Sequence, residues 1–246
     1  MDATTLNQAA ICAAAAAYVY SPKEEMLSKI SQLGGIGDFE FFKHDGTEAA
    51  CFVLNGYNYI VFRGTEPNKF KDIQADLRGW KTKSDTTGRV HFGFKESLDD
   101  VWANIVKWIE SSKNNPIIVC GHSLGGALAT LAGSRIKDCT VYSFGSPRVG
   151  NRVWCKQQTF THYRFVNNND LVPKVPFCLL GYKHYGNLCY INHYGNIRKP
   201  TAWQKFKDGW RGRSTALKKF QLFDGIYDHS MTKYKNKIEH VLRSNS

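Results

Sequence analysis

The sequence predicts an α/β domain with a mostly parallel central sheet and helices on both faces. The main observation is that apolar, strand-like runs alternate with helical stretches between residues 92 and 167, which is typical of βαβ units. A second observation is size, because 246 residues, 42% of them hydrophobic, are enough for one large core. Since no repeat, low-complexity tract or linker divides the sequence, we expect a single domain over residues 1–246.

Each element is predicted by a local signal. Residues 5–20 are rich in alanine, the best helix former, and predict the first helix. Asn55-Gly56 lies between two β-rich runs within residues 51–62 and is typical of a tight hairpin. Residues 91–112 carry apolar side chains at helical spacing and predict an amphipathic helix. The alternation is completed by predicted strands over 116–120, 140–146 and 162–167 and by a small-residue helix over 124–136.

Positive charge is concentrated in the last third of the chain. Residues 171–246 contain 14 Lys and Arg against 4 Asp and Glu, a balance of +10, whereas residues 1–170 contain 19 against 17, or +2. We therefore expect contact with an anionic partner. On a helix, the stretch 198–220 would place aromatic side chains on one face among lysines and arginines, which suits an anionic lipid surface. The alternative is that these aromatic side chains pack on the core.

The sequence lacks the signals of several other protein classes. No recognised nucleic-acid-binding motif occurs, so we expect no nucleic-acid partner. The alanine-rich N-terminal stretch has Asp2 where a signal peptide has positive charge, so we expect a cytoplasmic protein, or one exported without a recognisable signal. Seven cysteines, an odd number without a CxxC pair, predict mostly reduced thiols. Without CxxC or HExxH we expect no metal site. We also expect no cofactor.

The segment Gly121-His122-Ser123-Leu124-Gly125 places one serine between two glycines where a predicted strand turns into a predicted helix. A sharp turn of this kind strains the residue at the corner, and small neighbours avoid clashes with it. The turn also brings the hydroxyl near the helix N-terminus, where backbone N–H groups favour developing negative charge. These features predict a nucleophilic serine. The alternative is a glycine-rich helix start with an incidental serine.

A nucleophilic serine needs a base to remove its proton and an acid to orient that base. Asp170 follows the predicted strand 162–167, at the end where α/β sheets place their sites; the alternative is an aspartate that caps a turn. His229 lies in a loop before the last helix and reaches over the serine more easily than His184, which precedes a predicted strand. We interpret the other histidines, including His122, as core or surface residues.

Seven segments of the chain resemble, in order, the motifs of the class 3 lipases, which are fungal-lipase-like α/β-hydrolases. The resemblance extends from about residue 10 to 242, and its last two segments look most like bacterial or viral members. The segments are FRGTEP, VHFGF, CGHSLGGALATLAG, YSFGSPRVGN, YRFVNNNDLVPKVP, GYKHYG and DHSMTKY.

This resemblance implies an α/β-hydrolase fold and a serine carboxylic-ester hydrolase that cleaves acylglycerols or related acyl esters through an acyl-enzyme. It implies Ser123 as the nucleophile, Asp170 as the acid and His229 as the base. The substrate would be an acyl ester or a lipid. Two alternatives remain because of the basic C-terminal third: a phospholipase A-type activity on anionic membranes, and a non-catalytic module that binds such membranes.

The resemblance also implies roles around the serine. Thr65 matches the oxyanion-hole position of the family, and the backbone N–H of Leu124 would be the second donor. His184 would be a supporting histidine near the site. The family usually carries a lid after the oxyanion residue, and residues 67–80 occupy that place with a narrow apolar stripe. The alternative for this segment is an ordinary connecting helix.

Overall fold

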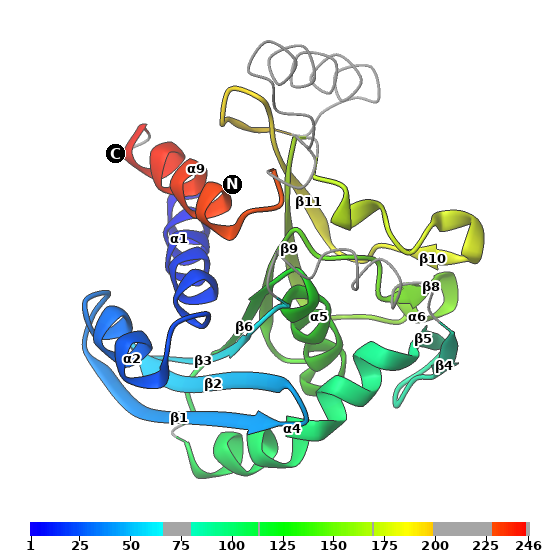
Figure 1. Ribbon diagram of the computed structural model, residues 1–246, viewed down its shortest axis with the longest axis horizontal. Helices are drawn as coiled ribbons and strands as arrows, with labels where there is room; N and C mark the ends of the chain where they lie inside the picture. Colours follow the sequence, from blue (N-terminus) through cyan, green and yellow to red (C-terminus); the bar gives the residue numbers. More distant parts are fainter. Residues whose placement is uncertain (66–79, 113, 169, 199–227, 245–246) are drawn as a thin grey trace.

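Eight strands of the described part of the chain form one central sheet (Figure 1). In sheet order they are β1 (Ile36–His44), β2 (Thr47–Leu54), β3 (Tyr57–Phe62), β6 (Ile117–His122), β7 (Thr140–Phe144), β9 (Thr161–Asn167), β11 (Asn187–Ile191) and β12 (Ile197–Arg198). The five strands from β3 to β11 pair in parallel. Antiparallel strands extend the sheet at both edges. The prediction of a mostly parallel central sheet is confirmed.

The structure is a computed structural model, and it describes residues 1–65, 80–112, 114–168, 170–198 and 228–244. Two predicted segments lie outside these ranges. One is the lid candidate 67–80, except for Trp80, and the other is the basic stretch 198–220, except for Arg198.

Helices cover both faces of the sheet, as predicted. Strand residues that alternate in direction pack into two separate cores, one for each layer of helices. The first layer contains α1 (Ala3–Tyr18), α2 (Lys23–Ser31) and α9 (Met231–Ser244). The second layer contains α4 (Phe92–Ser111), α5 (Leu124–Ile136) and α6 (Arg152–Lys156).

A small sheet and two short 3₁₀ helices complete the described elements. The sheet runs in the order β10 (Tyr182–Lys183), β8 (Gly150–Asn151), β5 (Arg89–His91) and β4 (Lys81–Lys83). The 3₁₀ helices are η2 (Val172–Lys174) and η3 (Cys178–Leu180).

Small side chains let α1 lie close to the sheet. Most of its alanines are buried, and the helix packs on β6. Its N-terminus is capped by Asp2, whose carboxylate accepts a hydrogen bond of 2.8 Å from the backbone N–H of Thr5. Helix α9 lies beside α1, so the described ends of the chain share one layer (Figure 1).

Two local predictions are confirmed in detail. In the turn between β2 and β3, Asn55 has φ of 50° and Gly56 has φ of 78°, and positive values at both positions are what a type I′ hairpin turn requires. Helix α4 turns one apolar stripe towards the sheet, and its buried residues are Phe94, Leu98, Val101, Ile105 and Trp108.

Two further properties concern membranes and redox state. Within the described ranges, none of the helices combines the length and apolar character that a bilayer crossing needs. All seven cysteines are described, and each is a free thiol.

Candidate active site

Ser123 occupies the corner between β6 and α5 in a strained backbone conformation. Its φ is 57° and its ψ is −125°, a combination of backbone angles that residues other than glycine rarely adopt. The surrounding backbone holds it there, because the N–H of Ser123 donates to the carbonyl of Phe144 at 3.0 Å and its own carbonyl accepts from Gly126 at 3.0 Å.

The two flanking glycines are required because backbone passes where their side chains would be. A Cβ on Gly121 would lie 2.3 Å from the carbonyl oxygen of Gly125. A Cβ on Gly125 would lie 2.2 Å from the carbonyl oxygen of Phe62, at the end of the neighbouring strand. The spacing of glycine and serine in the sequence therefore follows from the close contact of β3, β6 and α5.

The hydroxyl of Ser123 is buried and makes no described hydrogen bond. The side chain is fully buried, and its Oγ has no hydrogen-bond partner among the described residues. Helix α5 begins at the next residue, so the hydroxyl lies at the end of the helix that favours negative charge. Leaving a buried hydroxyl without a partner costs about 1–3 kcal/mol of stability. A hydroxyl in this state at a strained turn is therefore a candidate for a catalytic role.

Asp170 and His229 form a buried pair although 59 residues separate them. The Nδ1 atom of His229 lies 3.0 Å from Oδ2 and 3.1 Å from Oδ1 of Asp170. A carboxylate can only accept, so Nδ1 carries the proton and Nε2 is the basic nitrogen of this tautomer. The structure thus brings together two of the residues singled out in the sequence.

The carboxylate of Asp170 is held by two further donors. Oδ1 accepts from the backbone N–H of Val172 at 2.9 Å, and Oδ2 accepts from the hydroxyl of Tyr234 at 2.6 Å. Burial, followed by the charge of Asp170, raises the pKa of Tyr234 well above its ordinary value, so the phenol remains a donor. Tyr234 in turn accepts from the backbone N–H of Asn167 at 2.9 Å.

Tyr234 was not among the residues predicted to form the site. Its one signal was its place in the segment DHSMTKY, five residues after His229. Sequence spacing alone does not show which residue a tyrosine on a helix contacts. The hydrogen bonds of Tyr234 to Asn167, at the end of β9, and to Asp170 show it.

Gly145, directly after β7, makes room for the acid–base pair. It has a φ of 58°, and a Cβ there would lie 2.7 Å from Oδ2 of Asp170 and 2.9 Å from Nδ1 of His229. Any side chain at this position would displace the pair.

His122, which precedes Ser123, contacts His229 directly. Its Nε2–H donates to the backbone carbonyl of His229 at 2.6 Å, and its Nδ1 accepts from the hydroxyl of Tyr20 at 3.0 Å. The two imidazole rings lie 4.5 Å apart between centroids. Burial, and then the neighbouring His229, lowers the pKa of His122 well below its ordinary value, so the ring is neutral. His122, predicted to be a core or surface residue, is buried, and it also links Ser123 to the loop of His229.

Thr65 and Leu124 line one pocket of about 200 Å³, which Gly64 also lines and Ser123 does not. Gly64, the residue before Thr65, lies so close that a Cβ there would be 3.3 Å from the Cβ of Ser123. Glu48 and Arg63 line the same pocket and form an ion pair of 2.7 Å. The two residues expected to donate to an oxyanion therefore lie next to the same small cavity.

His184 lies against the segment that follows Asp170. Its Nε2–H donates to the carbonyl of Pro173 at 2.7 Å. Within the part of the chain that the structure describes, no hydrogen bond joins it to Ser123 or His229.

Among the residues that the structure describes, one group of side chains has the spacing of metal ligands. Ligand atoms of His44, Asp45 and Asp100 lie within 4.8 Å of one another. They share no residue with the site around Ser123, and exposed acidic groups of this kind are common without a metal.

The model of the family described as lipase (class 3) matches residues 59–180. This range contains Thr65, Ser123, Leu124 and Asp170. The match ends before His229, which the described contacts join to Asp170.

Two curated relatives are fungal. The secreted mono- and diacylglycerol lipase 1 of Fusarium solani is 41% identical over 106 residues, which cover 39% of this chain and 32% of the relative. The secreted mono- and diacylglycerol lipase A of Penicillium cyclopium is 34% identical over 164 residues, which cover 64% and 50%. This chain therefore spans about a third to a half of the length of these relatives.

Among solved structures, the triacylglyceride lipase of Rhizomucor miehei superposes with a TM-score of 0.69 at 20% sequence identity. The superposition covers 93% of this chain and 94% of that one. At this identity the likeness concerns the fold alone.

Proposed function

We propose, on the premise that the chain belongs to the class 3 lipase family and has the α/β-hydrolase fold, that it hydrolyses carboxylic esters of lipids. The observation that carries the proposal is the buried Asp170–His229 pair, which His122 links to a strained serine whose hydroxyl has no partner among the described residues. A fold of this class hosts many reactions, so the site and not the fold supports the activity.

In the proposed mechanism, Oγ of Ser123 attacks the ester carbonyl while Nε2 of His229 takes its proton. Asp170 holds the imidazole in the tautomer with the proton on Nδ1 and stabilises the cation that forms. The protonated His229 then gives its proton to the leaving alcohol, and an acyl-enzyme remains. Water attacks this ester in a second step with the same histidine as base.

Thr65 and Leu124 are the proposed donors to the oxyanion. The backbone N–H of Leu124 lies at the N-terminus of α5, where the helix dipole adds to its effect. Thr65 offers both a backbone N–H and a hydroxyl on the other wall of the same pocket. One such donor is worth about 3–4 kcal/mol of transition-state stabilisation.

The proposed substrates are mono- and diacylglycerols. Both fungal relatives carry such names. The ion pair of Glu48 and Arg63 in the wall of the pocket favours a substrate with free hydroxyl groups over a fully apolar triacylglycerol. A panel of monoolein, diolein, triolein, phosphatidylglycerol and a short chromogenic ester tests this choice. We expect monoolein and diolein to be cleaved fastest; faster cleavage of phosphatidylglycerol would favour the phospholipase alternative instead.

A covalent probe tests the nucleophile separately from the substrate. A fluorophosphonate should label the protein on the peptide 116–135, because attack of Ser123 on phosphorus imitates acylation. The Ser123→Ala variant is the matched control and should not be labelled. Labelling at another serine, or none, contradicts the proposed nucleophile.

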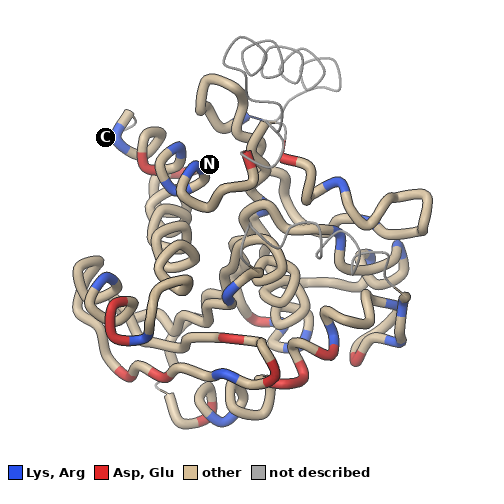
Figure 2. Tube along the Cα trace, in the orientation of Figure 1, with Lys and Arg blue, Asp and Glu red and all other residues tan. Residues whose placement is uncertain are grey.

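An anionic lipid surface is the proposed docking partner of the basic C-terminal third. In the described part of this third, the charged residues of α9 are four Lys and Arg against one Glu, whereas acidic residues gather along β1, β2 and α4 (Figure 2). Co-sedimentation with phosphatidylglycerol vesicles and with phosphatidylcholine vesicles tests the proposal. We expect binding to the anionic vesicles only, weakened by salt because salt screens surface charges. Equal binding to both, or none, contradicts it.

Export is the proposed route to the substrate. The fungal relatives are named as secreted proteins, which favours the exported alternative over the cytoplasmic one. Assay of the culture medium and of the cell lysate of the producing organism tests this choice, and activity confined to the lysate contradicts it.

A further inference from the structure

A buried arginine on β9 stands outside the site of Ser123 and has no role in the proposed mechanism. Arg164 is 9% exposed. Arg164 and His162 are two residues apart on the strand, so their side chains leave the same face of the sheet. Both line a small cavity together with Thr130 of α5 and Trp154 of α6. A guanidinium remains charged near neutral pH and is seldom buried without an acidic partner.

No acidic side chain of the described ranges pairs with this arginine. Its Nε has no hydrogen-bond partner there. Burial, and after it the charge of Arg148, lowers the pKa of Arg164 to about 10, which leaves the group cationic at neutral pH. Arg148 donates to the carbonyls of Lys174 and Pro176 and not to an acid. Two cations therefore gather here without a described carboxylate.

The cavity beside Arg164 has a volume of about 10 Å³, which is the space of about one water-sized particle. Trp154 lines it, and its indole Nε1, which can only donate, also has no partner among the described residues. An anion accepts from several donors at once. A water molecule could donate to Nδ1 of His162, which also has no partner among the described residues, but it would leave the charge of Arg164 unbalanced.

The two histidines of the cavity do not add to its charge. Burial, and then the charge of Arg164, lowers the pKa of His162 to about 3 and that of His184 well below its ordinary value. His162 is hydrogen-bonded through Nε2 to the hydroxyl of Ser143 at 2.8 Å. Lys183 also lines the cavity, but it is exposed to solvent. The one buried positive charge of the cavity is therefore that of Arg164, which matches a single negative charge.

We propose that this cavity binds one small monovalent anion such as chloride, with the guanidinium of Arg164 as its counter-charge. Chloride is somewhat larger than water, so the side chains that line the cavity would shift slightly to admit it. The bound anion would replace the missing carboxylate. It would also stiffen the segment 170–176, because His184 donates to the carbonyl of Pro173 and Arg148 to that of Pro176 at 2.9 Å. The proposal concerns stability and does not depend on ester hydrolysis.

Thermal unfolding in chloride tests the proposal. Sodium gluconate is replaced stepwise by sodium chloride at constant ionic strength, so that general screening stays the same. We expect a saturable rise of about 2–4 °C in the melting temperature of the wild type, because a ligand that binds only the folded state stabilises it. Arg164→Met should lose the rise. Arg135→Met, which removes another arginine from the same molecule, should keep it.

A wild type without the rise, or an Arg164→Met variant that keeps it, would overturn the proposal and leave a water molecule in the cavity. If Arg164→Met does not fold, crystals of the wild type grown in bromide decide. We expect an anomalous peak in contact with the guanidinium of Arg164, and its absence from that position would equally overturn the proposal.

Discussion

The site of Ser123 and the cavity of Arg164 are two buried polar clusters at β9. Among the described residues, only the first contains a carboxylate, that of Asp170. Asp170 follows the end of β9, where His229, Tyr234 and a backbone N–H all donate to it. Arg164 lies within β9 and faces neutral imidazoles and an indole. The first cluster balances its charge with its own side chains. The second needs an ion from solution.

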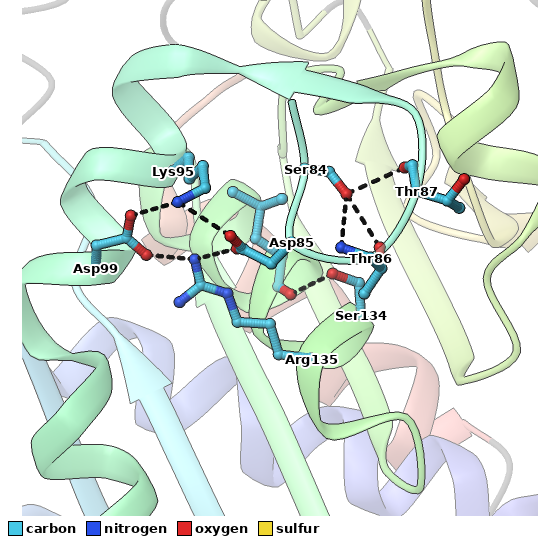
Figure 3. A network of polar contacts seen from close by, with 9 residues as sticks. Ser84, Asp85, Thr86, Thr87, Lys95, Asp99, Ser134 and Arg135 are labelled. Atoms are coloured by element: carbon cyan, nitrogen blue, oxygen red, sulfur yellow. Dashed lines mark hydrogen bonds and ion pairs between the residues drawn. The ribbon is translucent and has the colours of Figure 1, made fainter. Parts of the chain in front are cut away.

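A third charged group contains a matched arginine, that is, one paired with acidic side chains. Arg135, near the end of α5, points between Asp85 and Asp99, and Lys95 bridges the same two carboxylates (Figure 3). These acids are nearly half exposed, so water shares in their solvation. Arg164 is 9% exposed and has no acidic partner among the described residues. This difference is the reason why we assign a ligand to one arginine and not to the other.

The largest effect should come from breaking the cluster that contains the carboxylate. Ser123→Ala and His229→Ala should each lower kcat by roughly 10⁴- to 10⁶-fold, and the double variant by little more, because the two groups act as one unit. His184→Ala should keep measurable turnover, because His184 contacts the segment after Asp170 and not the serine. Hydrolysis of a chromogenic ester measures all four. Turnover lost in His184→Ala and kept in His229→Ala would reverse our assignment of the base.

Acid should destabilise the protein mainly through the cavity of Arg164. His122, His162 and His184 have lowered pKa values in the folded state, whereas unfolded histidine titrates near 6.5. Below that pH the unfolded chain binds protons that the native state does not, so the free energy of unfolding falls as pH falls. Each histidine contributes about 1.4 kcal/mol per pH unit well below pH 6.5.

Urea unfolding between pH 7.5 and 4.5 measures this slope. His184→Gln keeps an N–H for the carbonyl of Pro173 but cannot titrate, so its slope should be smaller than that of the wild type by about 1.4 kcal/mol per pH unit. An unchanged slope would mean that His184 is protonated in the folded state.

A pair of tyrosine variants compares the two clusters directly. Tyr234→Phe removes a donor from Asp170 and leaves the N–H of Asn167 without its acceptor, so we expect about 2–3 kcal/mol less stability and roughly tenfold lower kcat. Tyr185→Phe, beside Arg164, removes a hydrogen bond to the carbonyl of Phe160. It should cost about 1 kcal/mol and leave kcat unchanged. Equal kcat in both variants would show that Tyr234 only supports the fold.

The smallest effect is expected at the matched arginine. Arg135→Met should lower the free energy of unfolding by about 1 kcal/mol or less, because the two acids are nearly half exposed and water solvates them in part. The loss should shrink in 1 M salt, which screens exposed pairs. Urea unfolding at low and high salt measures it, and a loss that is large and independent of salt would show that this network is as critical as the buried ones.

Several parts of this molecule could be predicted from the sequence because their causes are local. The glycines around Ser123, the Asn55-Gly56 turn and the apolar stripe of α4 each depend on residues within a few positions of one another. Backbone strain, hairpin twist and helical periodicity act over that range, so a short pattern was enough. The alternation of strands and helices predicted the parallel sheet for the same reason.

What the sequence by itself determined, then, is the serine at its turn and the elements on both sides of it. Only the tertiary structure decided which side chains meet there. Tyr20 reaches His122 across 102 positions, and Tyr234 reaches Asp170 across 64. It also placed Arg164 in a cavity where no carboxylate has been described. Such contacts depend on which residues of distant strands and helices converge at one point, and no periodicity along the chain records that convergence.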